Sequence, residues 1–202
     1  MKQHIGLVRH GLTDWNAQGK IQGQTDIPLN ETGREQARLL AERLVQETAP
    51  FDYVISSGLQ RAEETASILA DALQIPLLSP VEGLRERAYG LVEGTTPEER
   101  EQRWGAEWRK MDLGQEKDEE LQYRAVQTLE HIANQHMGSN LLVVSHGSWL
   151  AQLYIALFGS DRQGHIGNLS YSILEKRSEG WHPLLYNCME HIRHLDLTAK
   201  PR

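Results

Sequence analysis

Short apolar segments alternate along the chain with longer segments in which apolar residues recur at helical spacing. The short segments predict β-strands at residues 4–9, 53–56, 75–78, 141–145, 169–174 and 182–186. Helical spacing is clearest in Ala37, Leu40, Ala41 and Leu44, in Ala62, Ala66, Leu69, Ala70 and Leu73, and in residues 148–158. Strands that alternate with helices in this way are typical of an α/β domain.

Local signals refine this picture. Residues 141–145 are almost purely aliphatic, which predicts a central parallel strand that is buried on both faces. Thr32 and Glu35 have the spacing of a capping box, so we expect a helix to begin there. We expect one of the two late strands to be antiparallel near an edge of the sheet. Between residues 95 and 120 the helical signal is broken and charged.

Polar residues that could bind or react with a ligand lie where predicted strands end. The first strand ends in Leu-Val-Arg-His-Gly with His10, and the aliphatic strand ends in Val-Val-Ser-His-Gly with His146. A third strand ends in Ile-Ser-Ser-Gly, and Arg61 follows in the first turn of the next helix. Ligands of open α/β sheets bind beyond the carboxyl ends of the strands. We therefore expect Arg9, His10, Arg61 and His146 to converge on one point.

Composition indicates a soluble globular protein of one domain. The 202 residues are 39% hydrophobic and 24% charged, and the longest apolar segment, Trp149 to Phe158, is too short to span a bilayer. We expect a single domain over residues 1–202. The N-terminus has no secretory pattern, and the single cysteine, Cys188, cannot form an intrachain disulfide. These features predict a cytoplasmic protein with no membrane partner.

The charge balance limits the class of ligand. Against 21 basic residues the chain has 28 acidic ones, a formal net charge of -7. Such a field repels a long polyanion, so we expect no nucleic acid partner. An anionic ligand would be small and held by a local positive cluster.

Six motifs in a fixed order resemble the histidine phosphatase superfamily, which is also called phosphoglycerate-mutase-like. They are LVRHGLTDWN, the pair Gln22-Gly23, DIPLNETGREQA, SSGLQRAEETA, LRERAYGLVEG and VVSHG. A single Arg-His-Gly recurs by chance, whereas the ordered set is specific. The fold that we expect is a three-layer α/β/α sandwich with a mostly parallel sheet of about six strands, one of them antiparallel near the edge.

The resemblance assigns a role to each matching residue. His10 corresponds to the nucleophile that becomes phosphorylated, and it must attack as a neutral imidazole. Arg9 and Arg61 correspond to the arginines that hold the phosphoryl oxygens, and His146 corresponds to a second histidine donating to the same group. The substrate-binding residues by this resemblance are Gly11, Thr13, Asn16, Gln22, Gly23 and Gly147, with Gly11 leaving room for phosphate.

Glu86 matches the acid/base of the family by its place before Tyr89-Gly90 and Glu93-Gly94. One carboxyl group can protonate the leaving oxygen and later deprotonate a water. Because fixed donors can stabilise the phosphoryl charge, we expect no metal and no cofactor. Without the motifs, each of these residues has a structural alternative: a satisfied strand-end histidine, a solvated helix arginine, or an exposed charged loop around Glu86.

Three functions remain open at this stage. The first is a phosphomonoesterase acting on a small phosphorylated metabolite, which the short interval between Glu86 and His146 favours. The second is a phosphoglycerate mutase, and the third is a non-catalytic relative that binds a phosphorylated ligand. Residues 95–120 are expected to form a variable segment resembling a lid, in which Trp104 and Trp108 lie four residues apart, as helical neighbours do. We expect these tryptophans to pack, with a lid that covers the substrate as the alternative. We expect the cations Arg100, Arg103, Arg109 and Lys110 to form a solvated face, with recognition of a second anionic group on the substrate, such as a carboxylate or another phosphate, as the alternative.

Overall fold

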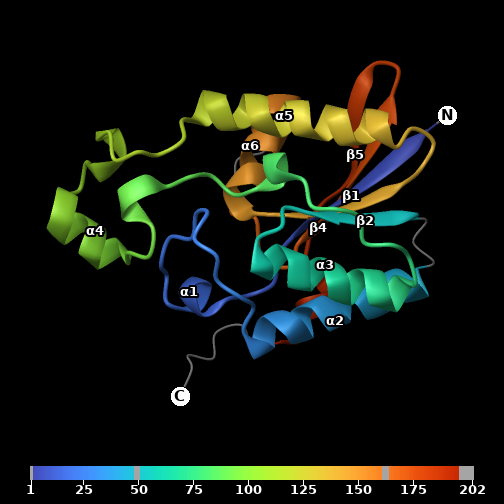
Figure 1. Ribbon diagram of the computed structural model, residues 1–202, viewed down its shortest axis with the longest axis horizontal. Coiled ribbons are helices and arrows are strands. Elements are labelled where there is room, and N and C mark those ends of the chain that lie inside the picture. Colours follow the sequence, from blue (N-terminus) through green and yellow to red (C-terminus); the bar gives the residue numbers. More distant parts are fainter. Residues whose placement is uncertain (1, 48–50, 161–163, 196–202) are drawn as a thin grey trace.

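A five-stranded mixed sheet forms the centre of the molecule. The computed structural model describes residues 2–47, 51–160 and 164–195. The strands are β1 (Gln3–Arg9), β2 (Tyr53–Ser56), β3 (Leu141–Ser145), β4 (Tyr171–Arg177) and β5 (Gly180–Cys188), in the spatial order β2-β3-β1-β4-β5 (Figure 1). Strands β1, β2 and β3 are parallel, and β4 is antiparallel to both of its neighbours. The prediction of one antiparallel strand near an edge is therefore confirmed.

The predicted strand at residues 75–78 does not form. In the described part of the chain, this segment makes only an isolated parallel bridge between Leu77 and Val54. Pro76 accepts a hydrogen bond from the Val54 N–H at 2.9 Å but has no N–H of its own to donate. The sheet has five strands where the sequence predicted about six.

Helices cover both faces of the sheet, as a three-layer sandwich requires. Helices α2 (Glu31–Gln46) and α3 (Gln60–Leu73) pack together on one face, and α5 (Asp118–Gln135) and α6 (Gly147–Phe158) pack together on the other (Figure 1). No helix in the described residues is both long enough and apolar enough to cross a bilayer.

The start of α2 differs from the prediction. Asn30 is the N-cap and accepts a hydrogen bond from the Gly33 N–H at 2.9 Å, so the cap lies two residues before Thr32 and the helix begins at Glu31. Asparagine caps a helix as well as threonine does, which the Thr32–Glu35 spacing concealed. A short helix, α1 (Asp14–Ala17), was also not predicted, and its capping box is formed by Thr13 and Asn16.

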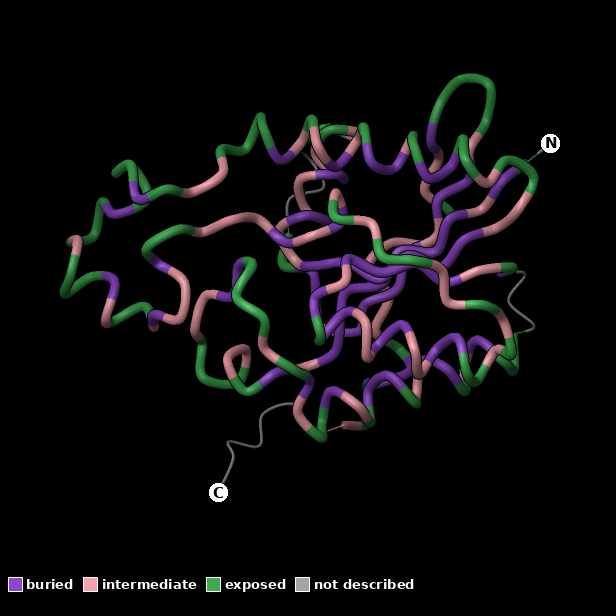
Figure 2. The backbone as a smooth tube through the Cα atoms, viewed as in Figure 1, coloured by how far each residue is buried: buried purple, intermediate pink, exposed green. Residues whose placement is uncertain are grey.

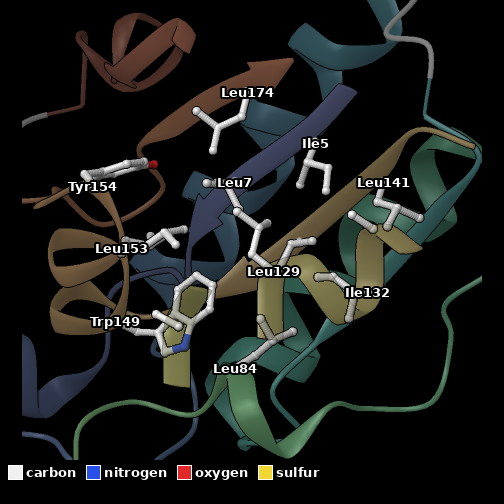
Figure 3. Packing of buried hydrophobic residues seen from close by; sticks show 14 of the residues in the cluster. Ile5, Leu7, Leu84, Leu129, Ile132, Leu141, Trp149, Leu153, Tyr154 and Leu174 are labelled. Atoms are coloured by element: carbon white, nitrogen blue, oxygen red, sulfur yellow. The ribbon is translucent and has the colours of Figure 1, made fainter. Parts of the chain in front are cut away.

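Strand β3 divides the core into two layers, as its aliphatic sequence predicted. Leu141 and Val143 face the cluster that contains Leu129 and Leu153 of the α5–α6 layer (Figure 3). Leu142 and Val144 face the opposite cluster with Leu40 and Leu69 of the α2–α3 layer. All five β3 residues are buried, and the tube view shows the buried strands at the centre of the molecule (Figure 2). Side chains that alternate between two faces bury both surfaces of a strand.

The segment between residues 95 and 120 extends away from the sheet (Figure 1). Helix α4 (Pro97–Trp104) stops at Gly105, whose φ of 75° favours glycine, and a 3₁₀ turn, η3 (Trp108–Lys110), follows. The two tryptophans therefore do not share a helix, although both pack in a small cluster with Val92 and Leu113.

Of the four cations expected to form a solvated face, Arg103, Arg109 and Lys110 are exposed and Arg100 is not. Arg100 is buried against the Trp108 ring at 5.2 Å, and Arg109 lies over the same ring at 4.5 Å. Two guanidinium groups on one indole stabilise this segment through cation–π attraction.

Candidate active site

The candidate site begins at the carboxyl ends of the three parallel strands. In the register of the sheet, Arg9 of β1 pairs with Ser145 of β3, so the next residues, His10 and His146, leave the sheet side by side. Their ring centroids are 5.1 Å apart, with the planes tilted by 57°. Strand β2 ends beside β3, and the Ser57 hydroxyl that follows it lies 2.7 Å from His146 Nε2. The predicted convergence at this sheet edge is present in the structure.

Two contacts define the tautomer of His10. Its Nδ1 lies 2.7 Å from the Gly11 carbonyl oxygen, which only accepts hydrogen bonds, so Nδ1 carries the proton. Arg61 Nε donates to His10 Nε2 at 3.3 Å, so Nε2 presents a lone pair. A neutral imidazole whose Nε2 has a lone pair and no proton is the form that attacks phosphorus.

Burial and local charge favour this neutral form. Burial lowers the pKa of His10 well below its usual value, and the positive charges of Arg61 and Arg9 lower it further. Burial likewise lowers the pKa of His146, followed by the charge of Arg61. Burial also lowers the pKa of Arg61 to about 10, a value that still leaves its guanidinium charged at neutral pH.

The two arginines are held in different ways. Arg9 donates from Nη1 to the Ile166 carbonyl at 2.6 Å, and its buried Nε has no partner among the described residues. Arg61 donates from Nη1 to the Thr25 carbonyl at 3.0 Å and from Nη2 to the Gly23 carbonyl at 2.7 Å. A guanidinium has five N–H donors, so both arginines retain donors for an anion.

Glu86 lies against the start of α6 and lines the same cavity as His10. Its Oε2 accepts the Ser148 N–H at 3.0 Å, and its Oε1 accepts the N–H groups of Trp149 at 3.0 Å and Arg87 at 2.8 Å. An acidic side chain at a helix N-terminus is favoured by the exposed N–H groups there. These three bonds fix a carboxyl group in the cavity that His10 also lines.

A cavity of about 280 Å³ joins these groups. Six of the predicted site residues line it, namely Arg9, His10, Asn16, Gln22, Glu86 and Gly147. The other five, Gly11, Thr13, Gly23, Arg61 and His146, are not among the lining residues. Arg61 and His146 still contact His10 directly.

The structure gives a reason for glycine at position 11 that differs from the predicted one. A Cβ at Gly11 would lie 2.5 Å from the Gly33 carbonyl oxygen, which shows that the glycine allows the backbone to pass the start of α2. Room beside the cavity is instead provided by Gly147, where a Cβ would lie 3.2 Å from Arg9 Nε.

Thr13, Asn16 and Gln22, which were predicted to bind substrate, form hydrogen bonds that stabilise the wall of the cavity. Gln22 Nε2 donates to the Thr13 hydroxyl, which in turn caps α1. Asn16 Oδ1 accepts the Asn168 amide at 3.1 Å, and Asn168 also donates to the His10 carbonyl at 3.1 Å. Gln22 Oε1 is buried with no partner in the described part of the chain, so it is free to accept a hydrogen bond from a ligand.

Sequence reasoning missed several groups that build or line the site. Lys20, Tyr89, Ser148 and His165 line the cavity, and Arg124 anchors the Glu86 segment by donating to the carbonyl oxygens of Gly83 and Arg85 at 2.8 Å each. Tyr89 stood within a quoted motif, whereas the others carried no sequence signal. In the described ranges, no three His, Cys, Asp or Glu side chains are grouped so as to hold a metal ion.

Comparison with known proteins agrees with this geometry. The family model of the histidine phosphatase superfamily (branch 1) matches residues 5–189. A metal-independent phosphoserine phosphatase of Arabidopsis thaliana is 37% identical over 186 residues, covering 88% of this chain and 78% of that protein. A probable phosphoglycerate mutase GpmB of Photorhabdus laumondii is 34% identical over 190 residues, covering 88% and 86%.

Solved structures give the same result. YhfR of Bacillus stearothermophilus superposes with a TM-score of 0.84 at 30% identity, covering 94% of this chain and 99% of that one. A phosphoserine phosphatase mutant of Entamoeba histolytica, in complex with phosphoserine, has a TM-score of 0.78 at 27% identity, covering 94% and 99%. The chain therefore belongs to the histidine phosphatase superfamily, branch 1, and is a phosphatase- or mutase-like enzyme.

Proposed function

We propose that this chain is a metal-independent phosphomonoesterase that hydrolyses small phosphate esters through a phosphohistidine on His10. The observation that carries the proposal is the buried His10 ring, whose proton is fixed on Nδ1 by the Gly11 carbonyl and whose Nε2 stands among Arg9, Arg61 and His146. The names of the relatives support a phosphorylated substrate, because one acts on phosphoserine and one structure holds phosphoserine.

The first step transfers the phosphoryl group to the protein. The His10 Nε2 lone pair forms a bond to phosphorus, and the bond from phosphorus to the ester oxygen breaks. The leaving oxygen takes a proton from Glu86, which lines the same cavity. The Gly11 carbonyl stabilises the positive charge that the phosphorylated ring acquires, and the guanidinium of Arg9 stabilises the charge on the phosphoryl oxygens.

The second step releases phosphate. Glu86, now a carboxylate, takes a proton from a water molecule as the water oxygen attacks phosphorus. The bond between Nε2 and phosphorus breaks, and inorganic phosphate leaves with His10 neutral again. Glu86 is suited to both steps because three backbone N–H groups hold its position.

The test follows p-nitrophenyl phosphate turnover in the presence of EDTA. We expect His10→Ala to remove turnover, because no other nucleophile replaces the imidazole, and Glu86→Gln to lower it by about 10²-fold or more. Glu82→Gln, an exposed carboxylate nearby, and His131→Ala, an exposed imidazole on α5, serve as matched controls that keep parental activity. Undiminished turnover by His10→Ala would end the covalent mechanism, and loss of parental turnover in EDTA would end the metal-independent one.

A mutase is the second candidate, because GpmB proteins are among the relatives. The assay follows 3-phosphoglycerate and records both its isomerisation and the release of inorganic phosphate. We expect phosphate release to dominate. Isomerisation without loss of phosphate would identify a mutase instead.

A further inference from the structure

The cavity has a buried floor and a more open mouth. The reacting groups Arg9, His10 and Glu86 are each at least nine-tenths buried. The remaining lining becomes more exposed along the segment after α1, where Lys20 is half-buried, and at His165, which is exposed. Because Lys20 and His165 line the same cavity as His10 but are more exposed, they are candidates to contact the part of a phosphate ester beyond its phosphorus.

Lys20 is the cation of this mouth. Apart from Arg9 on the floor, it is the only permanently cationic side chain that lines the cavity in the described residues. Its ammonium has no ion pair or hydrogen bond within the described ranges, whereas Lys2, Lys110 and Lys176 each have an acidic partner. In a protein of net charge -7, a lysine that faces a cavity without a carboxylate partner has its three N–H donors available for a ligand.

Its backbone holds Lys20 in this position. The Lys20 N–H donates to the Trp15 carbonyl at 2.9 Å at the end of α1, and the next residue, Ile21, donates to the Thr95 carbonyl at 3.1 Å. At the other exposed part of the lining, the Asn187 side-chain amide donates to the His165 carbonyl at 3.0 Å. Both walls of the mouth are therefore fixed by hydrogen bonds.

His165 can donate a hydrogen bond to an anion as a neutral ring. Burial and the charge of Arg9 both lower the pKa of His165, so its ring is neutral at neutral pH and can donate one N–H. Among the residues that the structure describes, Glu86 on the floor is the only acidic side chain in the lining. The mouth thus attracts a negative group, and the cavity of about 280 Å³ limits the distance between that group and the phosphate to a few bonds.

We propose that Lys20, assisted by His165, binds a carboxylate on the leaving group, so that the preferred substrates are short phosphorylated carboxylic acids. The inference rests on the proposed phosphatase function and deepens it by assigning the specificity of the same cavity. A charge-assisted contact of this kind discriminates a carboxylate from a neutral group by about 10- to 100-fold.

Two pairs of esters that differ at the carboxylate test this assignment. Phosphoserine is compared with phosphoethanolamine, and 3-phosphoglycerate with glycerol 3-phosphate, by kcat and KM for phosphate release. We expect the parent enzyme to prefer the acid of each pair. Lys20→Met should reduce that preference about 10- to 100-fold, mainly through KM. Lys20→Arg should retain it because the charge remains, and Lys110→Met, which removes an exposed lysine, should leave it unchanged.

Two results would overturn the assignment: a parent enzyme without preference for the acids, or a Lys20→Met variant whose preference equals that of the parent. If the parent releases no phosphate from any ester, including p-nitrophenyl phosphate, the proposed function fails by itself. Calorimetric titration of the same four esters then decides the subsite. Weaker binding of only the acids by Lys20→Met supports it, and equal binding of all four rejects it.

Discussion

At the scale of single residues, the protonation state of His10 is controlled by its neighbours. The Gly11 carbonyl fixes the proton on Nδ1, and Arg61 contributes both a hydrogen bond to Nε2 and a positive charge. A buried cation next to an imidazole disfavours the imidazolium. Arg61 thus has a role in the resting enzyme besides any contact with phosphate.

This role predicts a shift in pH dependence. In the proposed mechanism only neutral His10 attacks, so kcat/KM should fall when the ring gains a proton, and the lowered pKa places this acid limb well below pH 6.5. Arg61→Met removes a positive charge that lowers the pKa, so the limb should move to higher pH. NMR titration of the His10 ring measures the same shift directly, and Arg61→Lys, which keeps the charge, should shift it less. An unchanged or lower His10 pKa in Arg61→Met would contradict the argument.

At the scale of elements, the turn η2 (Gly90–Val92) and the residue after it organise the loop that Arg61 binds. Glu93 accepts the N–H groups of Gln24 at 3.0 Å, Thr25 at 2.9 Å and Tyr89 at 3.0 Å. The carbonyls of the same loop, at Gly23 and Thr25, hold the Arg61 guanidinium. The loop is therefore fixed by a carboxylate through its N–H groups and by an arginine through its carbonyls.

Glu93 is accordingly a positioning residue that acts through Arg61. Glu93→Gln replaces one acceptor oxygen with an NH₂ group that faces backbone donors, and we expect kcat/KM to fall about 10-fold or more. In an Arg61→Met background the same substitution should cost little more, because residues of one network are not additive. Glu82→Gln is the control for loss of a surface carboxylate. Fully additive losses in the double variant would show that Glu93 does not act through Arg61.

The elements also show which sequence signals were reliable. The aliphatic residues 141–145 and the helical face of α3 were predicted correctly because burial imposes a strict period on such segments. The start of α2 was misplaced because Asn30 and Thr32 are both good caps, and only the local backbone selects between them. The strand at 75–78 failed because pairing depends on a neighbouring strand and on the missing N–H of Pro76.

At the scale of the whole molecule, buried histidines connect stability to pH. His10 and His146 have pKa values well below the usual value, and burial, followed by the charge of Arg43, lowers the pKa of His191 to about 4. The unfolded chain binds protons at these rings near pH 6.5, and the folded chain does not. The stability that these neutral histidines contribute is therefore fully present above pH 6.5 and is lost as the pH falls below it.

The free energy of unfolding should reveal this linkage. Between pH 7 and pH 5 we expect a decrease to which His191 alone contributes about 1–2 kcal/mol. His191→Leu should reduce the pH dependence by that amount, whereas His131→Leu, at an exposed position on α5, is the control for loss of an imidazole. Urea unfolding at both pH values measures the difference. The linkage is wrong if His191→Leu shows the same pH dependence as the parent and as the control His131→Leu.

The sequence by itself determined the α/β class, the buried central strand and the placing of Arg9, His10 and His146 at strand ends, because a residue's position along a strand is local information. Only the tertiary structure decided the sheet register that brings the centroids of the His10 and His146 rings to 5.1 Å. It also decided the hydrogen bonds by which Glu93 and Arg124 fix the loops around the cavity, and the place of Lys20 at the mouth of the cavity. Those contacts join segments far apart in the chain, and their geometry depends on how the layers pack, which no periodic pattern encodes.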